Sequence, residues 1–407
     1  MFILNDQLVD LVPLDDAVFA HPQPHRYGLH LQKTDNVLRH IVGLRDAGAG
    51  VFPIHPDNPA DKAREMAVQA GCDRFVGDDG VTEIPQTSDA LGGVLVQMSS
   101  GTTGAPKVIT RSWADVQTEV ASYVRFFTQA APMTPVIACP ITHSYGLIAG
   151  LMVAMERGHV PVVIDTLNPK YILRRMREVR DPLLYTSPAM LHMLASFLPE
   201  RQQLYAAMTS GTILSQPWFE KIRAKTTHLF QQYGCSEVGC IAINPDLQNP
   251  SDVGYSLPHL QLTTSQDVQE PAPIIVAIGD QQVATGDRGF VQPDGMLTFV
   301  SREDDVIDVA GQNVYPHDIE QAALAMEGIA DALAFRMQDD LAGNRAGLIF
   351  EGTGVAPDAL QAWLTDRLAP YQQPVAIHQV PQLPRQANGK INRRDVARQF
   401  TTSEVSA

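Results

Sequence analysis

The sequence predicts an α/β protein with a large N-terminal domain and a small C-terminal domain. Runs of residues typical of strands alternate with runs typical of helices, which is the pattern of βαβ units. The chain has 407 residues, of which 44% are hydrophobic, enough for roughly two or three domains with a sizeable core. The sequence turns charged near residues 302–308. We therefore place the boundary there and expect domains over residues 1–302 and 303–407.

The first part of the N-terminal domain shows this alternation most clearly. Asn58 and Pro59 predict the start of a helix that ends at Gly71. Residues 93–98, Gly-Val-Leu-Val-Gln-Met, predict a buried strand. A loop rich in Gly, Ser and Thr follows, and then a helix capped by Ser112. Strand, glycine loop and helix thus stand in the order that phosphate-binding sites use.

Later segments extend the same pattern. The apolar runs 160–164 and 273–278 are bounded by turn residues and predict strands. The C-terminal domain is expected to contain a helix from Asp318 and an apolar run at 346–350. It should also contain a second helix, which carries Leu360, Trp363, Leu364 and Leu368.

Composition excludes several classes of function. The formal charge is −15, which argues against nucleic acid as a partner because such surfaces cluster Lys and Arg. The longest apolar stretch, residues 146–155, is too short for a membrane span, and the N-terminus does not resemble a signal peptide. We expect a cytoplasmic protein. Its scattered cysteines predict buried thiols rather than disulfides or a zinc site: Cys72, Cys139, Cys235 and Cys240.

The segment Ser99-Ser100-Gly101-Thr102-Thr103-Gly104-Ala105-Pro106-Lys107 has the composition of a phosphate-binding loop. Glycines let backbone N–H groups approach phosphate oxygens, hydroxyls add donors, and a lysine adds positive charge. The glycine spacing does not fit the P-loop pattern, which argues against a P-loop phosphotransferase. On its own, the segment is equally well explained as a flexible turn.

Five further motifs follow the loop in order. They are Tyr233-Gly234-Cys235-Ser236-Glu237, Thr285-Gly286-Asp287, Arg302, the run from Gly311 to Glu320, and the run from Pro384 to Ile391. Together with the loop they resemble the adenylate-forming superfamily of acyl-CoA synthetases, peptide-synthetase adenylation domains and luciferases, over about residues 36–394. Pro316 makes the fourth motif most similar to that of acyl- and aryl-CoA ligases.

This resemblance implies a fold and a reaction. The fold would be a large N-terminal domain with mixed sheets and flanking helices, and a small α+β C-terminal domain that rotates about a hinge. The reaction would be that of an AMP-forming carboxylic acid–CoA ligase, with ATP, Mg²⁺ and coenzyme A. Loading of the acid onto a carrier-protein phosphopantetheine is one alternative, and a non-catalytic nucleotide-binding regulator is another. The acid and the oligomeric state, including a homodimer, stay open.

The resemblance also assigns residues to the phosphates and the metal. Glu237 would hold Mg²⁺, Ser236 would bond the α-phosphate, and Lys390 would reach both the substrate carboxylate and the α-phosphate. Such charges are needed because a carboxylate that attacks a phosphate brings two anions together. The β- and γ-phosphates would be held by Ser99, Ser100, Gly101, Thr102, Thr103, Gly104 and Lys107.

A second set is implied at the nucleoside. Asp287 would accept hydrogen bonds from the ribose hydroxyls, and Arg302 would assist there. Tyr233 would stack on adenine, with a buried structural tyrosine as the alternative, and Gly234 would let the backbone pass close to the base. Taken alone, the motif around Tyr233 would be a turn before a helix, with Glu237 in the first helical turn.

The remaining assignments concern the acid and the thiol. His143, in Pro140-Ile141-Thr142-His143-Ser144-Tyr145-Gly146, would border the acyl pocket and the thiol entrance, against the alternative of a hydrogen-bonded core residue. Gly211, Val238 and Gly239 would line the pocket, and the two glycines suggest room for an aryl or medium-length chain. Asp304 would be the hinge, with a plain linker charge as the alternative. After rotation, Gly311, Gln312 and Asn313 would line a pantetheine tunnel.

Two features depart from the family pattern. The chain before the phosphate loop is about half the usual length, so part of an N-terminal subdomain is expected to be reduced. Asp308 stands where many relatives carry a lysine or another polar residue, and the sequence offers no reason for the exchange.

Overall fold

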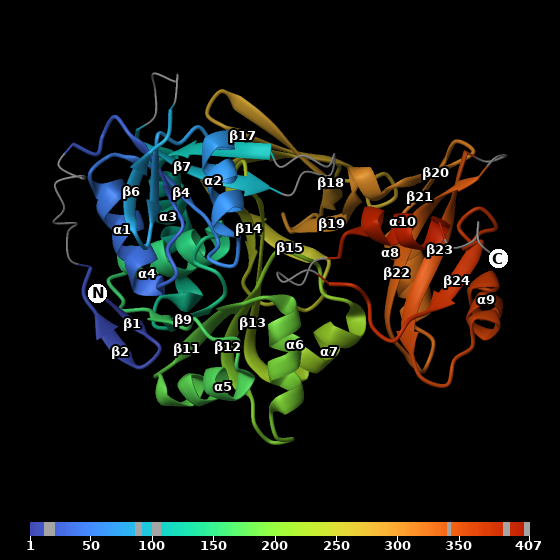
Figure 1. Ribbon diagram of the computed structural model, residues 1–407. Helices are drawn as coiled ribbons and strands as arrows, with labels where there is room; N and C mark the ends of the chain where they lie inside the picture. Colours follow the sequence, from blue (N-terminus) through green and yellow to red (C-terminus); the bar gives the residue numbers. More distant parts are fainter. Residues whose placement is uncertain (12–20, 86–91, 100–106, 340–342, 386–390, 403–407) are drawn as a thin grey trace.

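The structure is a computed structural model that describes residues 1–11, 21–85, 92–99, 107–339, 343–385 and 391–402. Helices and strands alternate along the chain, and the described residues form four sheets. Two large sheets precede residue 302 and two small ones follow it, so the mixed α/β fold class is confirmed. The C-terminal part, orange to red in Figure 1, lies to one side of the rest.

The larger sheet has 13 strands in the order β16-β17-β18-β19-β15-β14-β13-β12-β11-β9-β10-β1-β2. Neighbours from β1 through β10, β9, β11 and β12 to β13 are parallel, while β2 and the strands from β14 onward pair antiparallel. Its strands are β1 (Phe2–Leu4), β2 (Gln7–Val9), β9 (Thr134–Ala138), β10 (Val162–Val163), β11 (Pro182–Thr186), β12 (Leu204–Thr209), β13 (Thr226–Cys235), β14 (Gly239–Asn244), β15 (Asp252–Ser256), β16 (Gln261–Thr263), β17 (Ala272–Ile278), β18 (Gln281–Val291) and β19 (Leu297–Arg302).

The second large sheet has six strands in the order β6-β5-β3-β4-β7-β8, with the central four parallel and both edges antiparallel. Its strands are β3 (Arg26–Leu29), β4 (Gly50–Pro53), β5 (Arg74–Gly77), β6 (Gly80–Glu83), β7 (Val94–Ser99) and β8 (Lys107–Ser112). The helical segments of the N-terminal part are α1 (Thr34–Asp46), α2 (Ala60–Gln69), α3 (Trp113–Phe126), a 3-10 turn (Thr128–Ala130), a π-helix (Tyr145–Met152), α4 (Val153–Glu156), α5 (Pro169–Glu178), α6 (Pro188–Phe197) and α7 (Gln216–Ala224).

Strand β8 corrects the predicted order of strand, glycine loop and helix. The loop does not lead directly into a helix, because β8 follows it and pairs antiparallel with β7. Val, Ile and Thr in β8 favour a strand, and its burial alternates as a half-buried strand requires. Helix α3 begins only after it, with the expected cap, since the Ser112 hydroxyl accepts from the Asp115 N–H.

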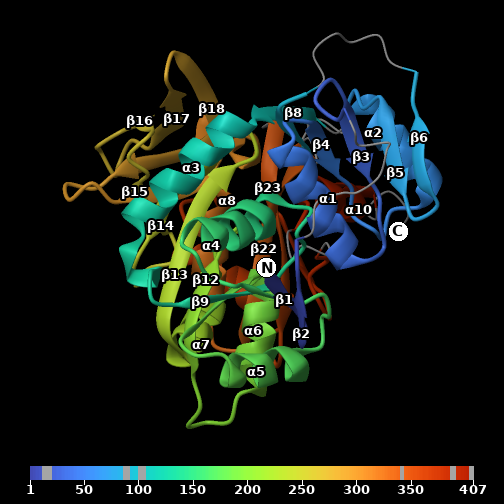
Figure 2. The same ribbon diagram turned by 90° about the vertical axis from the view of Figure 1, so that its left-hand side faces the viewer.

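Helix α3 joins the two large sheets. It contacts β8 of the six-stranded sheet and β14 of the 13-stranded sheet, and it crosses the face of the larger sheet in Figure 2. Val116, Val120 and Tyr123 place its apolar stripe in a core that both sheets share. The apolar run 146–155 is a buried helical segment in the same core. No helix in the described ranges could cross a membrane.

The C-terminal part has its own core and a sheet in the order β22-β23-β24 beside a two-stranded ribbon, β20-β21. Helix α8 begins at Pro316, two residues before the expected start, because proline suits the first helical turn. Leu368 follows the end of α9 but still packs in that core. The elements are β20 (Ile307–Val309), β21 (Gln312–Val314), α8 (Pro316–Leu324), β22 (Ile329–Asp339), β23 (Gly343–Gly352), α9 (Pro357–Thr365), β24 (Ala376–Gln379) and α10 (Arg393–Thr402).

Candidate active site

The turn between β13 and β14 carries the Tyr233–Glu237 motif. Strand β13 ends at Cys235 and β14 begins at Gly239, so a strand follows the turn, and the helix start expected from the motif alone is wrong. A Cβ at Gly234 would lie 2.0 Å from the Gly239 carbonyl oxygen, and Gly239 has a φ of +92°. The neighbouring strand thus leaves no room for a side chain at 234, and the passage of this backbone close to adenine stays a prediction.

Lys107 and Glu237 meet across this turn. Lys107 Nζ donates to Glu237 Oε1 at 2.8 Å, and this ion pair joins the first residue of β8 to the turn. The hydrogen bond to Glu237, with its negative charge, raises the pKa of Lys107. Burial is the largest single influence and raises the pKa of Glu237, but the hydrogen bonds that its carboxylate accepts, from Lys107 above all, and the charge of Lys107 together outweigh it, so the net shift is downward. Both groups are therefore charged at neutral pH.

Cys235 lies beside Glu237 in the same turn. Burial raises the pKa of its thiol to about 12, and the S–H group hydrogen-bonds Glu237. The cysteine is therefore a neutral donor and not a thiolate nucleophile. All four cysteines are free thiols that are buried or half-buried, as the sequence predicts.

Asp287 lies at the centre of a second cluster of polar side chains. Its carboxylate accepts from the Tyr233 hydroxyl at 2.6 Å and lies 3.1 Å from Arg302 Nη1. Asp287 and Arg302 are paired in the register of β18 and β19. A Cβ at Gly286, whose φ is +74°, would lie 3.3 Å from Arg302 Nη2, so glycine leaves room for the guanidinium. Residues far apart in sequence thus meet at one buried carboxylate.

Tyr233 is largely buried, and its hydroxyl is used by Asp287. Burial, followed by the charge of Asp287, raises the pKa of the tyrosine. The phenol therefore stays protonated and donates a strong hydrogen bond to an ionised acceptor. Its stacking on adenine stays a prediction.

A buried ion pair behind the turn was not predicted from the sequence. Arg111 Nη2 on β8 lies 2.6 Å from Glu119 Oε2 on α3, and the other Glu119 oxygen accepts from the Cys240 N–H at 2.7 Å. Only 6% of the Arg111 side chain and 3% of the Glu119 side chain are exposed. The pair therefore ties β8, α3 and β14 together at Cys240, three residues along the chain from Glu237. The feature of the sequence that could have revealed this pair is Glu119, a charged residue on the apolar stripe of α3, three residues from Val116.

The predicted acyl-pocket residues have different environments. His143 is exposed, so the alternative of a core histidine is wrong. Gly211 is exposed and has a φ of +90°, whereas Val238 is fully buried. The predicted room beside Gly239 is filled, because a Cβ there would meet Glu119 at 2.3 Å and Arg111 at 2.5 Å. The role of all four in acid binding stays a prediction.

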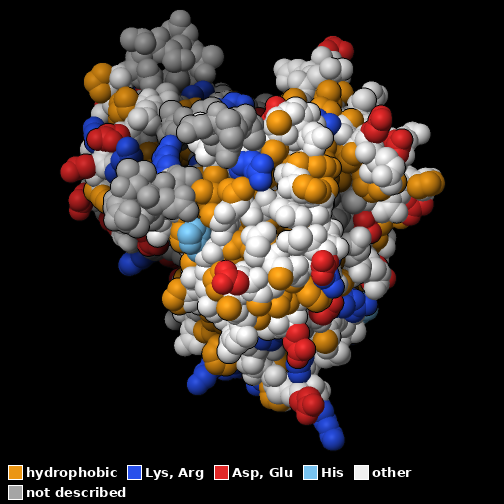
Figure 3. Space-filling model, turned by 90° about the vertical axis from the view of Figure 1, so that its right-hand side faces the viewer, with side chains coloured by type: hydrophobic (Ala, Val, Ile, Leu, Met, Phe, Trp, Pro, Cys, Tyr) orange, Lys and Arg blue, Asp and Glu red, His pale blue; other side chains and the backbone are white. Residues whose placement is uncertain are grey.

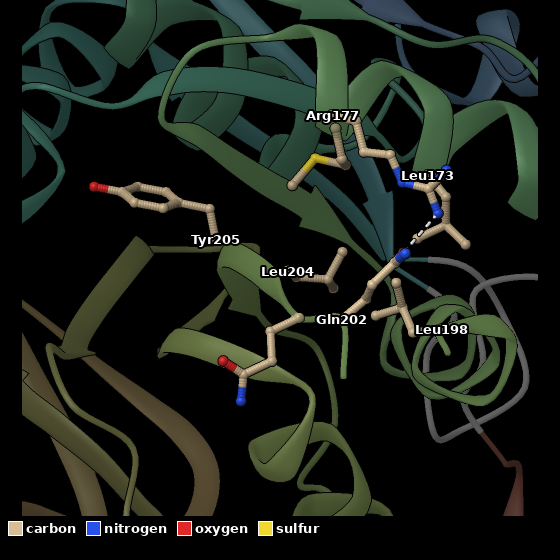
Figure 4. Close-up of a pocket in the computed structure, with 8 residues that line it drawn as sticks. Leu173, Arg177, Leu198, Gln202, Leu204 and Tyr205 are labelled. Atoms are coloured by element: carbon tan, nitrogen blue, oxygen red, sulfur yellow. Dashed lines mark hydrogen bonds between the residues drawn. The ribbon is translucent and has the colours of Figure 1, made fainter. Parts of the chain in front are cut away.

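A surface pocket lies among α5, the end of α6 and β12 (Figure 4). Arg177 donates to Gln202 at 3.0 Å on its rim. None of its lining residues belongs to the predicted site: Leu173, Met176, Arg177, Leu198, Gln202, Gln203, Leu204 and Tyr205.

The predicted hinge and tunnel residues follow β19. Asp304 lies in a 3-10 turn (Glu303–Asp305), 3.4 Å from Arg394, and its backbone carbonyl accepts from Arg336. Asp308 accepts from the Gly311 N–H at 2.7 Å, and Gly311 has a φ of +85°. The carboxylate thus fixes the β20–β21 turn, which gives a physical reason for aspartate at 308. Gly311, Gln312 and Asn313 are exposed in this turn and the start of β21.

Several predicted residues fall partly or wholly outside this geometry. Ser236 is half-buried in the β13–β14 turn, and Ser99 ends β7. Ser100, Gly101, Thr102, Thr103, Gly104 and Lys390 lie outside the described residues.

Within the described ranges, no group of three or more His, Cys, Asp or Glu side chains could hold a metal ion on its own. Mg²⁺ at nucleotide sites usually binds one or two carboxylates together with phosphate oxygens. The partly exposed carboxylate of Glu237, beside Lys107, fits that mode. In Figure 3, Lys and Arg are interspersed with Asp and Glu on the face that carries the C-terminal part, without a continuous basic surface.

The chain is similar to several known proteins. A 3,4-dihydroxybenzoate–[aryl-carrier protein] ligase from Bacillus anthracis is 33% identical over 386 residues, which span 92% of each chain. A 2-succinylbenzoate–CoA ligase from Lactococcus lactis is 22% identical and covers 74% of this chain and 70% of its own. ATP-bound MatB from Rhodopseudomonas palustris shares the fold, with a TM-score of 0.80 at 18% identity over 93% of this chain and 89% of its own.

Family models match both parts of the chain. Residues 85–274 match the AMP-binding enzyme family, and residues 318–390 match the AMP-binding enzyme C-terminal domain. With a relative above 30% identity over nearly the whole length, the chain belongs to the AMP-binding enzyme family of the adenylate-forming superfamily.

Proposed function

We propose that the protein activates an aromatic carboxylic acid with ATP and transfers the acyl group to the phosphopantetheine thiol of an aryl carrier protein. The observation that carries this proposal is the 33% identity, over 92% of each chain, to a ligase that acts on 3,4-dihydroxybenzoate and an aryl carrier protein. The Lys107–Glu237 pair and the Asp287–Arg302 pair support the nucleotide chemistry. Free CoA, the acceptor first expected from Pro316, becomes the second candidate.

The reaction has two steps. A carboxylate oxygen of the acid attacks the α-phosphorus of ATP, and the bond to pyrophosphate breaks. The thiol, having lost its proton, then attacks the acyl carbon, and AMP leaves. The first step joins two anions, so its barrier depends on cationic groups that neutralise the developing charge.

The residues of this chain divide that work. Lys107 and the loop that precedes it bind the β- and γ-phosphates, while Asp287 and Arg302 bind the ribose. Glu237 would hold Mg²⁺, which supplies positive charge at the phosphates. Lys390 bridges the carboxylate and the α-phosphate in the first step. For the second step, Asp304 is the hinge about which the C-terminal domain turns.

Free CoA remains a candidate on one specific observation. Pro316 starts α8 in the motif that resembles acyl- and aryl-CoA ligases, and a relative with 22% identity is a CoA ligase. The same adenylate would serve either acceptor, so the two candidates differ only in the second step.

The test measures the two steps separately. ATP–pyrophosphate exchange is measured with Mg²⁺ and a panel of hydroxybenzoates, other aryl acids, fatty acids and amino acids. The best acid is then incubated with free CoA, with an aryl carrier protein bearing phosphopantetheine, and with the same carrier lacking it. We expect exchange with a hydroxybenzoate and thioester on the phosphopantetheine-bearing carrier alone.

Each other outcome has a defined meaning. Efficient thioester formation on free CoA would replace the carrier by CoA as the acceptor. Exchange only with aliphatic acids would overturn the aromatic substrate class. Binding of ATP without exchange for any acid would favour the nucleotide-binding regulator.

A further inference from the structure

Helices α6 and α7 present a stacked pair of rings. The His192 ring on α6 lies parallel to the Trp218 indole on α7, with centroids 4.3 Å apart and an interplanar angle of 5°. Burial, followed by the charges of Lys221 and Arg385, lowers the pKa of His192 to about 4. The imidazole is therefore neutral at pH 7, and the stack carries no positive charge of its own.

The guanidinium of Arg385 lies over this stack. Its Cζ is 4.3 Å from the centroid of the Trp218 ring. Arg385 also forms an ion pair with Asp331 on β22, whose side chain is only 6% exposed. One side chain of the C-terminal part is thus anchored in its own domain by a carboxylate and meets the N-terminal part through an indole, the aromatic ring that cations favour most.

The position of Arg385 in the chain gives this contact its meaning. It belongs to the Pro384–Ile391 motif and precedes Lys390 by five residues. Helix α7, which carries Trp218, also contacts α8 of the C-terminal part. The Trp218–Arg385 contact therefore holds Arg385, which precedes this lysine in the sequence, against the N-terminal part.

We propose that Trp218 and Arg385 form a reversible latch that positions Lys390 for the first half-reaction. The latch must open when the C-terminal domain turns for thiol transfer, so it acts on one half-reaction and not on the other. Both are positioning residues, since neither is placed at the reacting atoms. This inference rests on the proposed function for its kinetic effect, but the contact itself can be tested without activity.

The first experiment tests the contact. The chain has three tryptophans, Trp113, Trp218 and Trp363, so the full-length protein labelled with 5-fluorotryptophan has three ¹⁹F resonances, and Trp218→Phe identifies one of them. Arg385→Gln keeps a donor for Asp331 but removes the cation. We expect it to shift the Trp218 resonance selectively. If only the Trp113 or Trp363 resonance moves, or none does, the latch is overturned whatever the protein catalyses.

The second experiment tests the role. Trp218→Leu is expected to lower the kcat of pyrophosphate exchange about fivefold, in line with the loss of one solvated cation–π contact, with little change in the KM for ATP. Thiol transfer from purified acyl-adenylate should stay unchanged. Trp218→Tyr keeps an aromatic face and should restore most of the exchange.

The chain offers a matched control. Arg367 Cζ lies 3.2 Å from the Trp363 ring within the C-terminal part, and Arg367→Ala removes the same type of contact without crossing the two parts. It should leave both half-reactions unchanged. Equal loss of both half-reactions in Trp218→Leu would overturn the latch and assign Trp218 a structural role. If the wild-type protein exchanges pyrophosphate with no acid, the proposed function fails, while the ¹⁹F result still decides whether the contact exists.

Discussion

The two attachments that surround the candidate active site differ in kind. At Cys240, the Arg111–Glu119 pair is almost completely buried and also holds a backbone N–H of β14. Toward the C-terminal part, Arg385 rests on a half-exposed indole and is itself 21% exposed. Breaking a buried ion pair costs several kcal/mol, whereas breaking a solvated cation–π contact costs about 1 kcal/mol. Parts that must stay fixed are held by buried charge, and a part proposed to turn is held by a contact that opens easily.

The largest effect is expected at Lys390, the proposed catalytic lysine of the C-terminal part. Lys390→Ala should lower the rate of adenylate formation about 10³-fold, roughly 4 kcal/mol, because it removes the charge that offsets the first transition state. Pyrophosphate exchange measures it, and Lys170→Ala, on α5, serves as a control for the loss of a lysine. A Lys390 variant that exchanges at the wild-type rate would contradict this role.

The buried Arg111–Glu119 pair is tested by removing the charge of Glu119. Glu119→Gln should lower the free energy of unfolding by about 3 kcal/mol, because Arg111 stays buried without a countercharge. Chemical denaturation measures this loss. Glu156, which accepts from Gln117 on the surface, offers a matched control, and Glu156→Gln should change stability by less than about 0.5 kcal/mol. Similar losses in both variants would remove the distinction between buried and solvated attachments.

A smaller effect is expected at the nucleoside cluster. Asp287→Asn should raise the Kd of ATP about tenfold, or roughly 1.4 kcal/mol, because a neutral amide loses the ion pair with Arg302 and accepts more weakly from hydroxyls. Titration calorimetry measures this affinity. Asp294 accepts from Tyr255 in an exposed turn, so Asp294→Asn removes a similar contact and should leave ATP affinity unchanged. Wild-type affinity in Asp287→Asn would exclude the ribose role.

The last expected effect concerns the pH dependence of stability at the ring stack beside the latch. The pKa of His192 is lowered from 6.5 to about 4 in the folded protein, so between these values the unfolded chain binds a proton that the folded chain does not. The contribution of neutral His192 to the stability of the folded protein is therefore fully present above pH 6.5, and it is lost as the pH falls toward 4. Thermal unfolding at pH 7, 6, 5 and 4 measures this slope. His192→Gln should flatten part of it, and an unchanged slope would show that His192 is not the group responsible.

The sequence predicted what depends on local signals. Ser112 caps α3 as expected, because a hydroxyl three residues before the Asp115 N–H is a short-range interaction. The ordered motifs identified the family for a similar reason, because each motif is a run of a few adjacent residues and is visible in the sequence alone. Helix α8 began two residues early only because Pro316 suits its first turn.

The errors arose where distant segments meet. Strand β8 was missed because its identity depends on pairing with β7, and the space beside Gly239 was misjudged because Arg111 and Glu119 fill it from two other elements. Asp308 had no explanation until its bond to the Gly311 N–H was seen. Pairing, burial and turn geometry are properties of the folded chain, and a linear pattern of residues does not contain them.

The Lys107–Glu237 pair has a consequence for how ligands enter. Because the ammonium and the carboxylate neutralise each other at 2.8 Å, an anion that takes Lys107 releases a carboxylate, and a cation that takes Glu237 releases an ammonium group. A nucleotide alone would leave Glu237 without its partner, and a metal ion alone would leave Lys107 without its partner. A metal–nucleotide complex would pair with both residues at once. At the proposed nucleotide site the two ligands would therefore favour each other's binding reciprocally, so that the site would select a charge-matched pair over either component.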